Sequence, residues 1–330
     1  MKMKTPLIDG ALSQIGSEFV SEKQKLGYSY SSNAYIVRDF SRFIETHKQF
    51  AESNTLVSKM MIEKWLASHA ETAPKSIKTQ INTIRQLAMF MNRNGVEAYV
   101  LPTLCIPKQK CDFNAYIFSY KQLASIFQEL DALKYSPVSP FRHIAMPLLF
   151  RMIYACGLRS SEATGLKLRD VDFINGIVHI RDSKFNKSRI IPIAESLCMR
   201  CKEYSQVVHK NCTYSDFFFS NAYKGEYHTS SIYTIFRDIL YKCNIPRVEH
   251  GPRVHDLRHT YAVHILKRWS LEKKDLTSAL PLLCTYMGHA DISGTQKYLQ
   301  LTSELYPHII TQLEDFYSDR KSKGGVIYGG

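Results

Sequence analysis

Two polar stretches of the chain have the residue types and spacing to bind a phosphate group. In GLRSSE, Arg159 follows a Gly-Leu pair and Glu162 comes one helical turn later. In HDLRHT, the residues His255, Arg258 and His259 occupy positions i, i+3 and i+4, which share one helix face. Crowded cationic groups favour an anion between them, and the planar arginine fork matches phosphate oxygens. The alternatives are a surface Arg159–Glu162 pair and a solvated basic helix face. Because the buried side of the HDLRHT helix includes Leu257, we expect its polar cluster to be an edge feature.

A third stretch, MGHADISGTQKYL, adds His289 and Tyr298. A tyrosine at helical spacing from Ile292 and Thr295 can be a packing residue. Among phosphate-binding groups, however, its hydroxyl can attack phosphorus and form a covalent intermediate. Lys184, in the polar turn SKFNKSR, can protonate the leaving oxygen. Arginines can stabilise the developing charge as a metal would, and there is no GxxxxGK[ST] loop for ATP.

Metal binding is the main competing chemistry. A C-x2-C pair followed by H-x2-C could bind zinc, through Cys198, Cys201, His209 and Cys212. The two cysteines of the pair lie in an amphipathic helical pattern, however, where small thiols can face a core. The paired histidines of HDLRHT lack a further ligand at HExxH spacing. We therefore expect no metal and no cofactor.

The residues before 101 are expected to form a small all-helical domain with basic faces. The chain has 330 residues, enough for about two domains. Within residues 1–100, periodic apolar residues predict helices over 29–50, 56–70 and 75–94, the first of them capped at Ser31 or Ser32, and the first 20 or so residues are expected to be a tail. The third helix carries basic residues that are candidates for DNA contact, namely Lys75, Lys78 and Arg85.

Residues 101–117 contain prolines and lysines without periodicity, which predicts a linker. Its Lys108 and Lys110 are further DNA-binding candidates. The catalytic domain is expected over 118–320. Helices are predicted at 120–134 and 141–156, a strand pair within 175–193, and helices beyond it; residues 321–330 should be a flexible tail. The fold class is therefore mainly α with a small antiparallel β-sheet.

Charge and composition indicate a polyanionic partner. The formal net charge is +13, which favours nucleic acid over an anionic membrane. There is no apolar run of membrane-spanning length, and Pro6 and Asp9 interrupt any signal-peptide pattern. The eight cysteines are scattered, which is typical of reduced thiols. We expect a cytoplasmic protein.

Together, the order and spacing of these residues resemble the tyrosine recombinase (phage integrase) family. That family's pattern is G-L-R-x-x-E, a lysine in a β-hairpin, H-x-L-R-H, G-H and then a tyrosine. This chain has GLRSSE, SKFNKSR, HDLRHT, MGH and Tyr298 in the same order. The resemblance covers the whole second domain, and the helical first domain is similar to the family's core-binding domain.

The resemblance implies a role for each matching residue. The scissile phosphate would be held by four of them, Arg159, His255, Arg258 and His289. Lys184 would be the general acid, with Lys187 as the competing lysine, and Tyr298 would form a 3′-phosphotyrosine. Glu162 would support the fold near Arg159. His259 would contact the catalytic residues without touching the phosphate itself.

The resemblance also implies an assembly. The two domains would clamp double-stranded DNA, and a homo-tetramer on two DNA sites would exchange strands through a Holliday junction. Residues 303–320 carry an apolar stripe that would pack on its own domain or on a neighbouring subunit. Integration or excision of a mobile element is the expected use, with accessory DNA-bending or directionality proteins as further partners.

Two features depart from the family's pattern. The segment between HDLRHT and MGH is several residues longer than usual, and Gln300 stands where a histidine is common. Two other functions compete with recombination. A type IB topoisomerase would use the same chemistry without assembling two sites. A non-catalytic DNA-binding protein would need the basic faces but not Tyr298.

Overall fold

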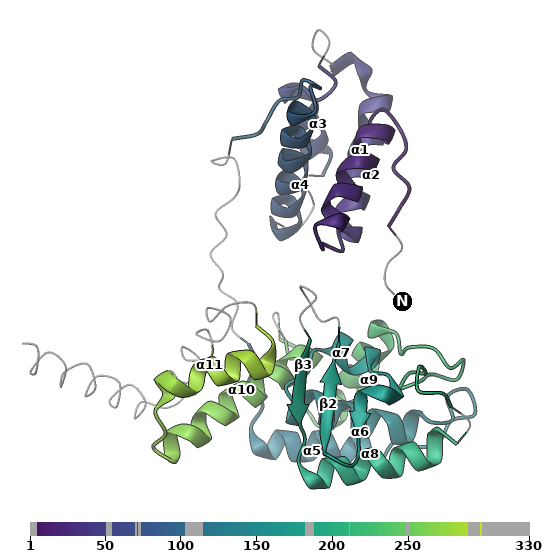
Figure 1. Ribbon diagram of the computed structural model, residues 1–330, viewed down its shortest axis with the longest axis vertical. Coiled ribbons are helices and arrows are strands. Elements are labelled where there is room, and N and C mark those ends of the chain that lie inside the picture. The colour runs from purple at the N-terminus through teal and green to yellow at the C-terminus, as the bar shows by residue number, and fades with distance from the viewer. Residues whose placement is uncertain are drawn as a thin grey trace, which may run out of the picture. The chain divides into compact units, whose positions relative to one another are not determined.

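The computed structural model describes residues 5–50, 55–69, 71, 74–102, 115–181, 188–210, 212–248, 251–289 and 298. The chain divides into two compact units, Met1–Asp112 and Phe113–Gly330, each with its own hydrophobic core (Figure 1). Several predicted residues lie outside the described part: Lys184, Lys187, Lys108, Lys110, Thr295 and the segment 303–320. No helix of the described part is long and apolar enough to cross a membrane.

The first unit is all helical. Its elements are α1 (Ser13–Lys25), α2 (Ser31–Thr46), the 3₁₀ turn η1 (Lys48–Phe50), α3 (Lys59–Ser68) and α4 (Pro74–Arg93). Phe19, Phe40 and Trp65 are fully buried at its centre. Trp65 donates from Nε1 to Asp39 at 2.9 Å, which satisfies its polar atom at the edge of this core.

Two expectations for this unit were wrong. The first 20 residues are not simply a tail, because α1 begins at Ser13 and both Leu12 and Phe19 are buried. The N-cap of α2 is Tyr30 rather than a serine, and no side chain caps that helix end. Tyr30 takes a left-handed backbone (φ 47°) there, so the turn is set by backbone geometry that polar sequence patterns do not reveal.

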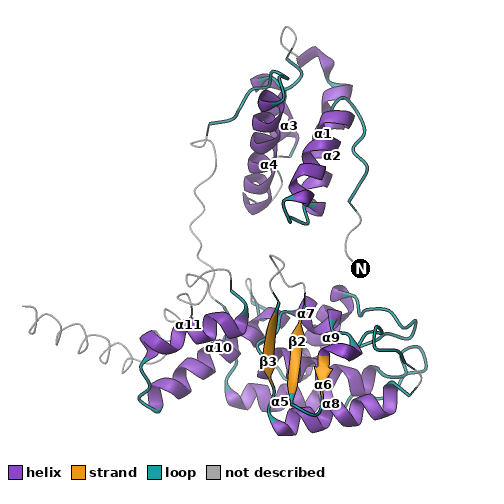
Figure 2. Ribbon diagram, in the orientation of Figure 1, coloured by secondary structure: helices purple, strands orange, loops and turns teal. Residues whose placement is uncertain are grey.

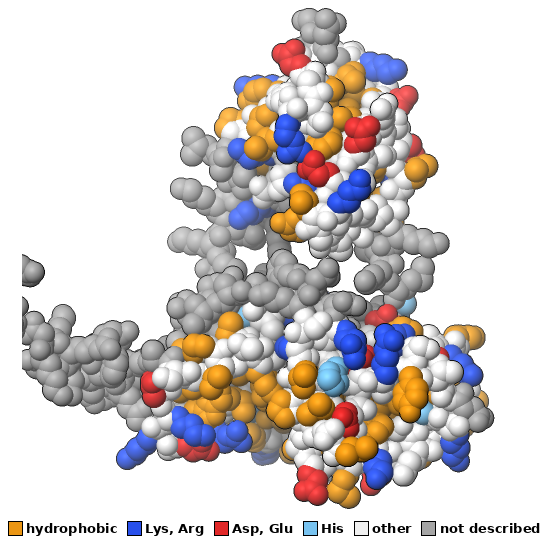
Figure 3. Space-filling view, in the orientation of Figure 1, with side chains coloured by type: hydrophobic (Ala, Val, Ile, Leu, Met, Phe, Trp, Pro, Cys, Tyr) orange, Lys and Arg blue, Asp and Glu red, His pale blue; other side chains and the backbone are white. Residues whose placement is uncertain are grey.

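The DNA-binding candidates of this unit differ in their surroundings. Lys78 is half-buried on α4. Arg85 donates from Nε to the carbonyl of Leu101 at 3.0 Å. This hydrogen bond links Leu101, after the last helix of the unit, to α4. The side chain of Lys75 lies outside the described part. Basic side chains are visible on both units in Figure 3, interspersed with acidic ones.

The second unit combines helices with a small sheet, as the sequence predicted (Figure 2). Its helical elements are α5 (Tyr120–Asp131), α6 (Arg142–Ala155), α7 (Ser160–Gly165), η3 (Leu168–Asp170), α8 (Glu195–Val208), α9 (Thr229–Lys242), α10 (Val254–Leu271) and α11 (Leu276–Met287). Its strands are β1 (Val171–Asp172), β2 (Ile177–Ile180) and β3 (Arg189–Pro192), antiparallel in that order. The two-residue β1 was not predicted, since it is too short to show alternation.

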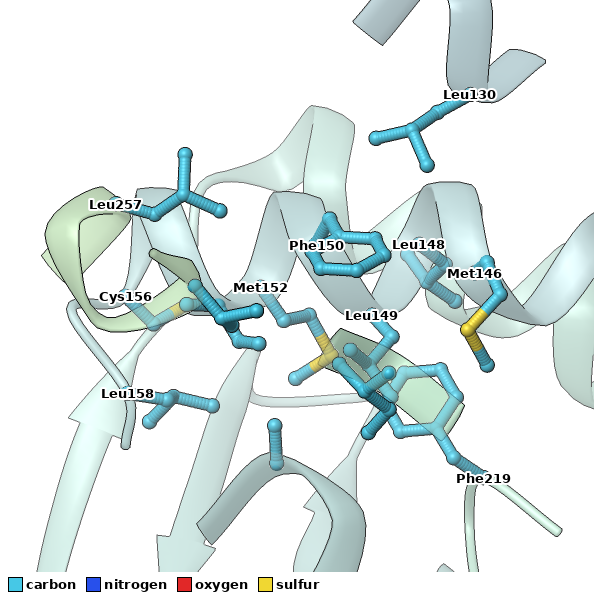
Figure 4. Packing of buried hydrophobic residues seen from close by; sticks show 14 of the residues in the cluster. Leu130, Met146, Leu148, Leu149, Phe150, Met152, Cys156, Leu158, Phe219 and Leu257 are labelled. Atoms are coloured by element: carbon cyan, nitrogen blue, oxygen red, sulfur yellow. The ribbon is translucent and has the colours of Figure 1, made fainter. Parts of the chain in front are cut away.

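Helix α6 lies at the centre of this unit because nearly all of its side chains are apolar. Phe150 and Met152 are fully buried along it, and Leu158 extends the same core (Figure 4). Leu257, from α10, joins this cluster. Leu158 and Leu257 belong to the GLR and HDLRH motifs, so core packing fixes the polar residues that follow them.

Gly157 makes the turn between α6 and Arg159. Its φ is +57°, and a Cβ there would lie 2.7 Å from the Tyr261 ring. We expect Gly157→Ala to lower the free energy of unfolding by about 2–4 kcal/mol, from left-handed strain and from the clash. Gly176→Ala is the matched control, with φ +62° but only an ordinary contact at 3.6 Å, and should cost about 1–2 kcal/mol. Urea denaturation measures the free energy of unfolding of both variants. Equal losses would mean that the contact with Tyr261 adds nothing to the cost of Gly157→Ala.

Candidate active site

Glu162 is the buried carboxylate around which the arginines gather. It is the third residue of α7, and its side chain is 4% exposed. The backbone N–H of Arg159 donates to its Oε2 at 2.9 Å, and Arg159 Nη1 donates to Oε1 at 2.6 Å. Arg258 Nη1 lies 3.8 Å from Oε2. Arg159 and Glu162 therefore form a partly buried pair within a network, not an isolated surface pair.

Arg258 is fully buried, with 1% of its side chain exposed. The expectation that the HDLRH cluster would be an edge feature was wrong for this residue. Its guanidinium donates to the carbonyls of Gly157 at 2.6 Å and Met287 at 2.5 Å, which offsets the cost of burying the charge. Burial, and then the neighbouring Arg159, lower the pKa of Arg258 to about 10, so it stays charged at neutral pH.

A third arginine, Arg189, was missed by the sequence analysis. It opens β3, and its guanidinium donates to both carboxylate oxygens of Glu162, at 3.0 and 2.8 Å. A polar turn precedes it and an apolar strand follows, and this pattern alone does not distinguish it from a surface residue. Three guanidinium cations and one carboxylate leave this cluster with a net charge of +2, which suits an anionic ligand.

The same three arginines bind successive carbonyls at the end of α11. Arg189 Nε donates to Tyr286 at 2.8 Å, Arg258 to Met287, and Arg159 Nη2 to Gly288 at 2.7 Å. The last carbonyls of a helix have no partner within it and carry partial negative charge, so they attract cations. Gly288 follows with φ +63°, and a Cβ there would lie 2.7 Å from Arg189 Nη1. This explains the glycine of the MGH motif.

Tyr298 lies near Arg258 and Arg159 and is almost fully buried, with 3% of its surface exposed. Its hydroxyl is 3.0 Å from His259 Nδ1, and its ring stacks with that of His289 at a centroid distance of 5.9 Å. Burial raises the pKa of Tyr298, while the charge and hydrogen bonding of Arg258 and the charge of Arg159 lower it. The hydroxyl is therefore protonated at neutral pH and faces a histidine nitrogen.

Three histidines share this environment. Desolvation, followed by neighbouring cationic and histidine groups, lowers the pKa of His255 to about 4, of His259 to about 3 and of His289 to about 4. The rings of His255 and His259 meet edge to face at 4.6 Å. His255 is the exposed member of the three, whereas His259 and His289 are partly buried. All three imidazoles are neutral at pH 7 in the DNA-free chain, so each has a ring nitrogen that can accept a hydrogen bond. A phosphate anion bound beside them would raise their pKa and make them better proton acceptors.

These pKa values predict loss of stability in acid. The folded-state pKa of His259 lies below the value of about 6.5 expected when unfolded, so the unfolded chain binds more protons between the two. The contribution of His259 to the free energy of unfolding is fully present above about pH 6.5, and it is lost as the pH falls toward 3. His259 alone should lower the free energy of unfolding by about 2 kcal/mol between pH 7 and 5. Urea titrations at both pH values measure it. His259→Gln should reduce the fall, and an unchanged fall would contradict the assignment.

The cysteine-rich set does not form a metal site in the described part of the chain. His209 has both ring nitrogens engaged, Nδ1 with Ser205 Oγ and Nε2 with the carbonyl of Phe218, each at 3.0 Å. Cys201 is buried in α8 beside Met152, and burial raises the pKa of its thiol. The core-thiol interpretation accounts for these contacts.

The structure thus brings together most of the residues that the sequence singled out. Arg159, Arg258, His259, His289 and Tyr298 are linked by the contacts above, and Glu162 lies at the centre of the arginines. His255 contacts His259 from the same helix face. With three cationic side chains around one carboxylate, neutral histidines and a buried tyrosine, the cluster can bind a phosphate and supply a nucleophile to it.

Comparison with known proteins identifies the family. Residues 118–304 match the model of the phage integrase family. A Sinorhizobium fredii (strain NGR234) protein named as integrase/recombinase y4rB is 26% identical over 316 residues, 93% of this chain and 98% of that protein. Tyrosine recombinase XerC of Oceanobacillus iheyensis is 27% identical over 287 residues, 83% and 88% of the two chains.

Solved structures share the fold. The XerH site-specific recombinase, bound to a palindromic difH substrate in a post-cleavage complex, superposes with a TM-score of 0.65 at 18% identity, covering 91% of this chain and 85% of that one. The family model alone spans more than half of the chain and contains all the motifs that meet around Glu162. This chain belongs to the phage integrase family.

Proposed function

We propose that this protein is a site-specific DNA recombinase that cleaves and rejoins DNA strands through a 3′-phosphotyrosine intermediate. The observation that supports this most directly is the Tyr298 hydroxyl beside His259, within reach of the arginine cluster's positive charge. Structural neighbours support double-stranded DNA as the partner, since XerH is solved with its palindromic difH substrate and the Tn1549 transposon integrase in complex with transposon right end DNA. The net charge of +13 suits the same partner.

In the proposed cleavage step, Tyr298 Oη forms a bond to the scissile phosphorus and the bond from phosphorus to the 5′ oxygen breaks. The tyrosine proton passes to the neutral His259 Nδ1, which lies 3.0 Å from the hydroxyl. Lys184 would give a proton to the departing 5′ oxygen. Arg159 and Arg258, with His255 and His289, would stabilise charge on the nonbridging oxygens.

Rejoining reverses these steps. A 5′ hydroxyl attacks the phosphotyrosine and releases Tyr298, so the energy of the original phosphodiester is conserved and no ATP is consumed. Exchange between two sites requires a synapse, and we propose a homo-tetramer joined through residues 303–320, which the sequence marks with an apolar stripe. Mobile-element integration or excision is the proposed use, supported by the relative named integrase/recombinase. Accessory DNA-bending proteins would act with it.

The test uses nicked duplexes cut from the DNA that flanks the gene. A nick beside the scissile phosphate lets the 5′ fragment diffuse away, so a covalent intermediate accumulates. Wild-type protein should give a protein–DNA adduct on a denaturing gel and transfer its strand to a second duplex. Adducts without transfer between sites would favour topoisomerase-like chemistry. Tight DNA binding with no adduct on any flanking duplex would contradict the proposal.

A further inference from the structure

We infer that Arg189 is a positioning residue for DNA cleavage: it locks Glu162 and the end of α11 together so that Arg159 and His289 are held for the phosphate. This inference rests on the proposed function. All three side-chain nitrogens of Arg189 are bound inside the protein, two to Glu162 and one to the carbonyl of Tyr286. Its side chain is only 9% exposed. Arg258 is also buried, but it lies beside the hydroxyl of Tyr298, whereas Arg189 is bound to Glu162 and to the end of α11. We therefore assign Arg189 a role that acts through its neighbours and not on DNA directly.

Arg189 and Arg159 share the carboxylate of Glu162. Oε1 accepts from Arg159 Nη1 at 2.6 Å and from Arg189 Nη1 at 3.0 Å, while Oε2 accepts the Arg159 backbone N–H and Arg189 Nη2. Removing Arg189 would leave a buried carboxylate with one close guanidinium partner fewer. Glu162 would then draw Arg159 more strongly, and Arg159 would have less freedom to meet a phosphate.

Arg189 also holds the backbone that leads into His289. It binds the Tyr286 carbonyl, and its Nη1 occupies the space where a Cβ on Gly288 would lie. His289 is the next residue along the chain. Arg189 itself is set by β3, where it pairs with Ile180 of β2. One side chain therefore ties the sheet, α7 and the end of α11 into a single unit, and small displacements of catalytic groups cost large factors in rate.

The chain provides a matched control in Arg151. Its guanidinium also forks a carboxylate, Asp131, at 2.8 and 2.6 Å, and donates to a backbone carbonyl, that of Pro147, at 3.2 Å. This pair joins α5 and α6, and its partners Asp131 and Pro147 are not members of the arginine cluster. Arg151→Met therefore removes a forked ion pair of the same geometry from the same unit, with a carboxylate that is 48% exposed where Glu162 is 4% exposed. It controls for the loss of such a pair away from the arginine cluster.

The experiment measures single-turnover adduct formation on a nicked duplex that wild-type protein cleaves. Arg189→Met should slow cleavage about 10²-fold with DNA affinity within about 3-fold, Arg189→Lys should recover part of the rate, and Arg151→Met should stay within about 3-fold of wild type. A second duplex carries a methylphosphonate at the mapped scissile position, which removes the negative charge that Arg159 would neutralise. On that duplex the Arg189→Met defect should shrink to about 10-fold or less.

Three results would overturn the inference. They are a wild-type rate for Arg189→Met, an equal loss for Arg151→Met, and a defect of the same size on the charged and the neutral duplex. The last of these would mean that Arg189 supports the fold without acting on phosphate binding. Failure of the wild-type protein to form any adduct would instead count against the proposed function, so the two are distinguishable.

Discussion

Tyr298→Phe is expected to abolish the covalent protein–DNA adduct while leaving DNA affinity nearly unchanged. The substitution removes one oxygen, which is the proposed nucleophile, and keeps the ring that stacks with His289. Loss of a covalent nucleophile lowers the rate by about 10⁴-fold or more, which puts the adduct below detection. Adduct formation on a denaturing gel and binding by mobility shift measure the two effects.

Tyr154→Phe is the matched control for this substitution. The Tyr154 hydroxyl lies 2.9 Å from His264 Nδ1, so the control removes a tyrosine–histidine hydrogen bond of the same kind from the same unit. It should keep full adduct formation, even if both variants are slightly less stable. A persistent adduct with Tyr298→Phe would disprove the nucleophile assignment, and another tyrosine would have to be sought.

The second large effect is expected from the two arginines of the motifs. Arg159→Ala and Arg258→Ala should each slow cleavage about 10²- to 10³-fold, equivalent to about 3–4 kcal/mol of transition-state stabilisation. Their effects on stability should differ. Arg258 is buried and holds the carbonyls of Gly157 and Met287, so its loss should also lower the free energy of unfolding by about 3–5 kcal/mol.

Single-turnover cleavage and urea denaturation, both at low temperature, separate these contributions. Arg159 is 19% exposed at its side chain, and its replacement should destabilise the fold less than that of Arg258. A cleavage rate within 10-fold of wild type for Arg159→Ala would contradict its proposed role at the phosphate.

The sequence predicted the helix of HDLRHT and the proximity of its three polar side chains, because residues at i, i+3 and i+4 share a helix face. It did not predict how deeply Arg258 is buried. That depth depends on carbonyl acceptors at Gly157 and Met287, which are distant in sequence and leave no side-chain signature. Arg189 was missed for the same reason, since its importance comes from Glu162 and Tyr286 and not from its own neighbours.

Element boundaries followed the apolar residues closely in two helices. The helix predicted over 75–94 is observed as Pro74–Arg93, and that over 141–156 as Arg142–Ala155. The expectation failed at α1, which has polar residues at most positions and is held by a few buried ones such as Phe19. The strand pair was predicted from GIVHI and RIIPI, whereas β1 exists only through its pairing with β2.

The contacts between the arginines and α11 have an evolutionary consequence. Because Tyr286, Met287 and Gly288 are recognised by their carbonyls, the arginine contacts do not depend on the side chains at the first two positions, whereas a Cβ at position 288 would clash with Arg189. Substitutions at the first two positions would preserve these bonds as long as the helix end packs. Inserting or deleting one residue would instead offer each guanidinium the wrong carbonyl and carry His289 out of place. Selection on this segment should therefore act on its length more strongly than on its composition.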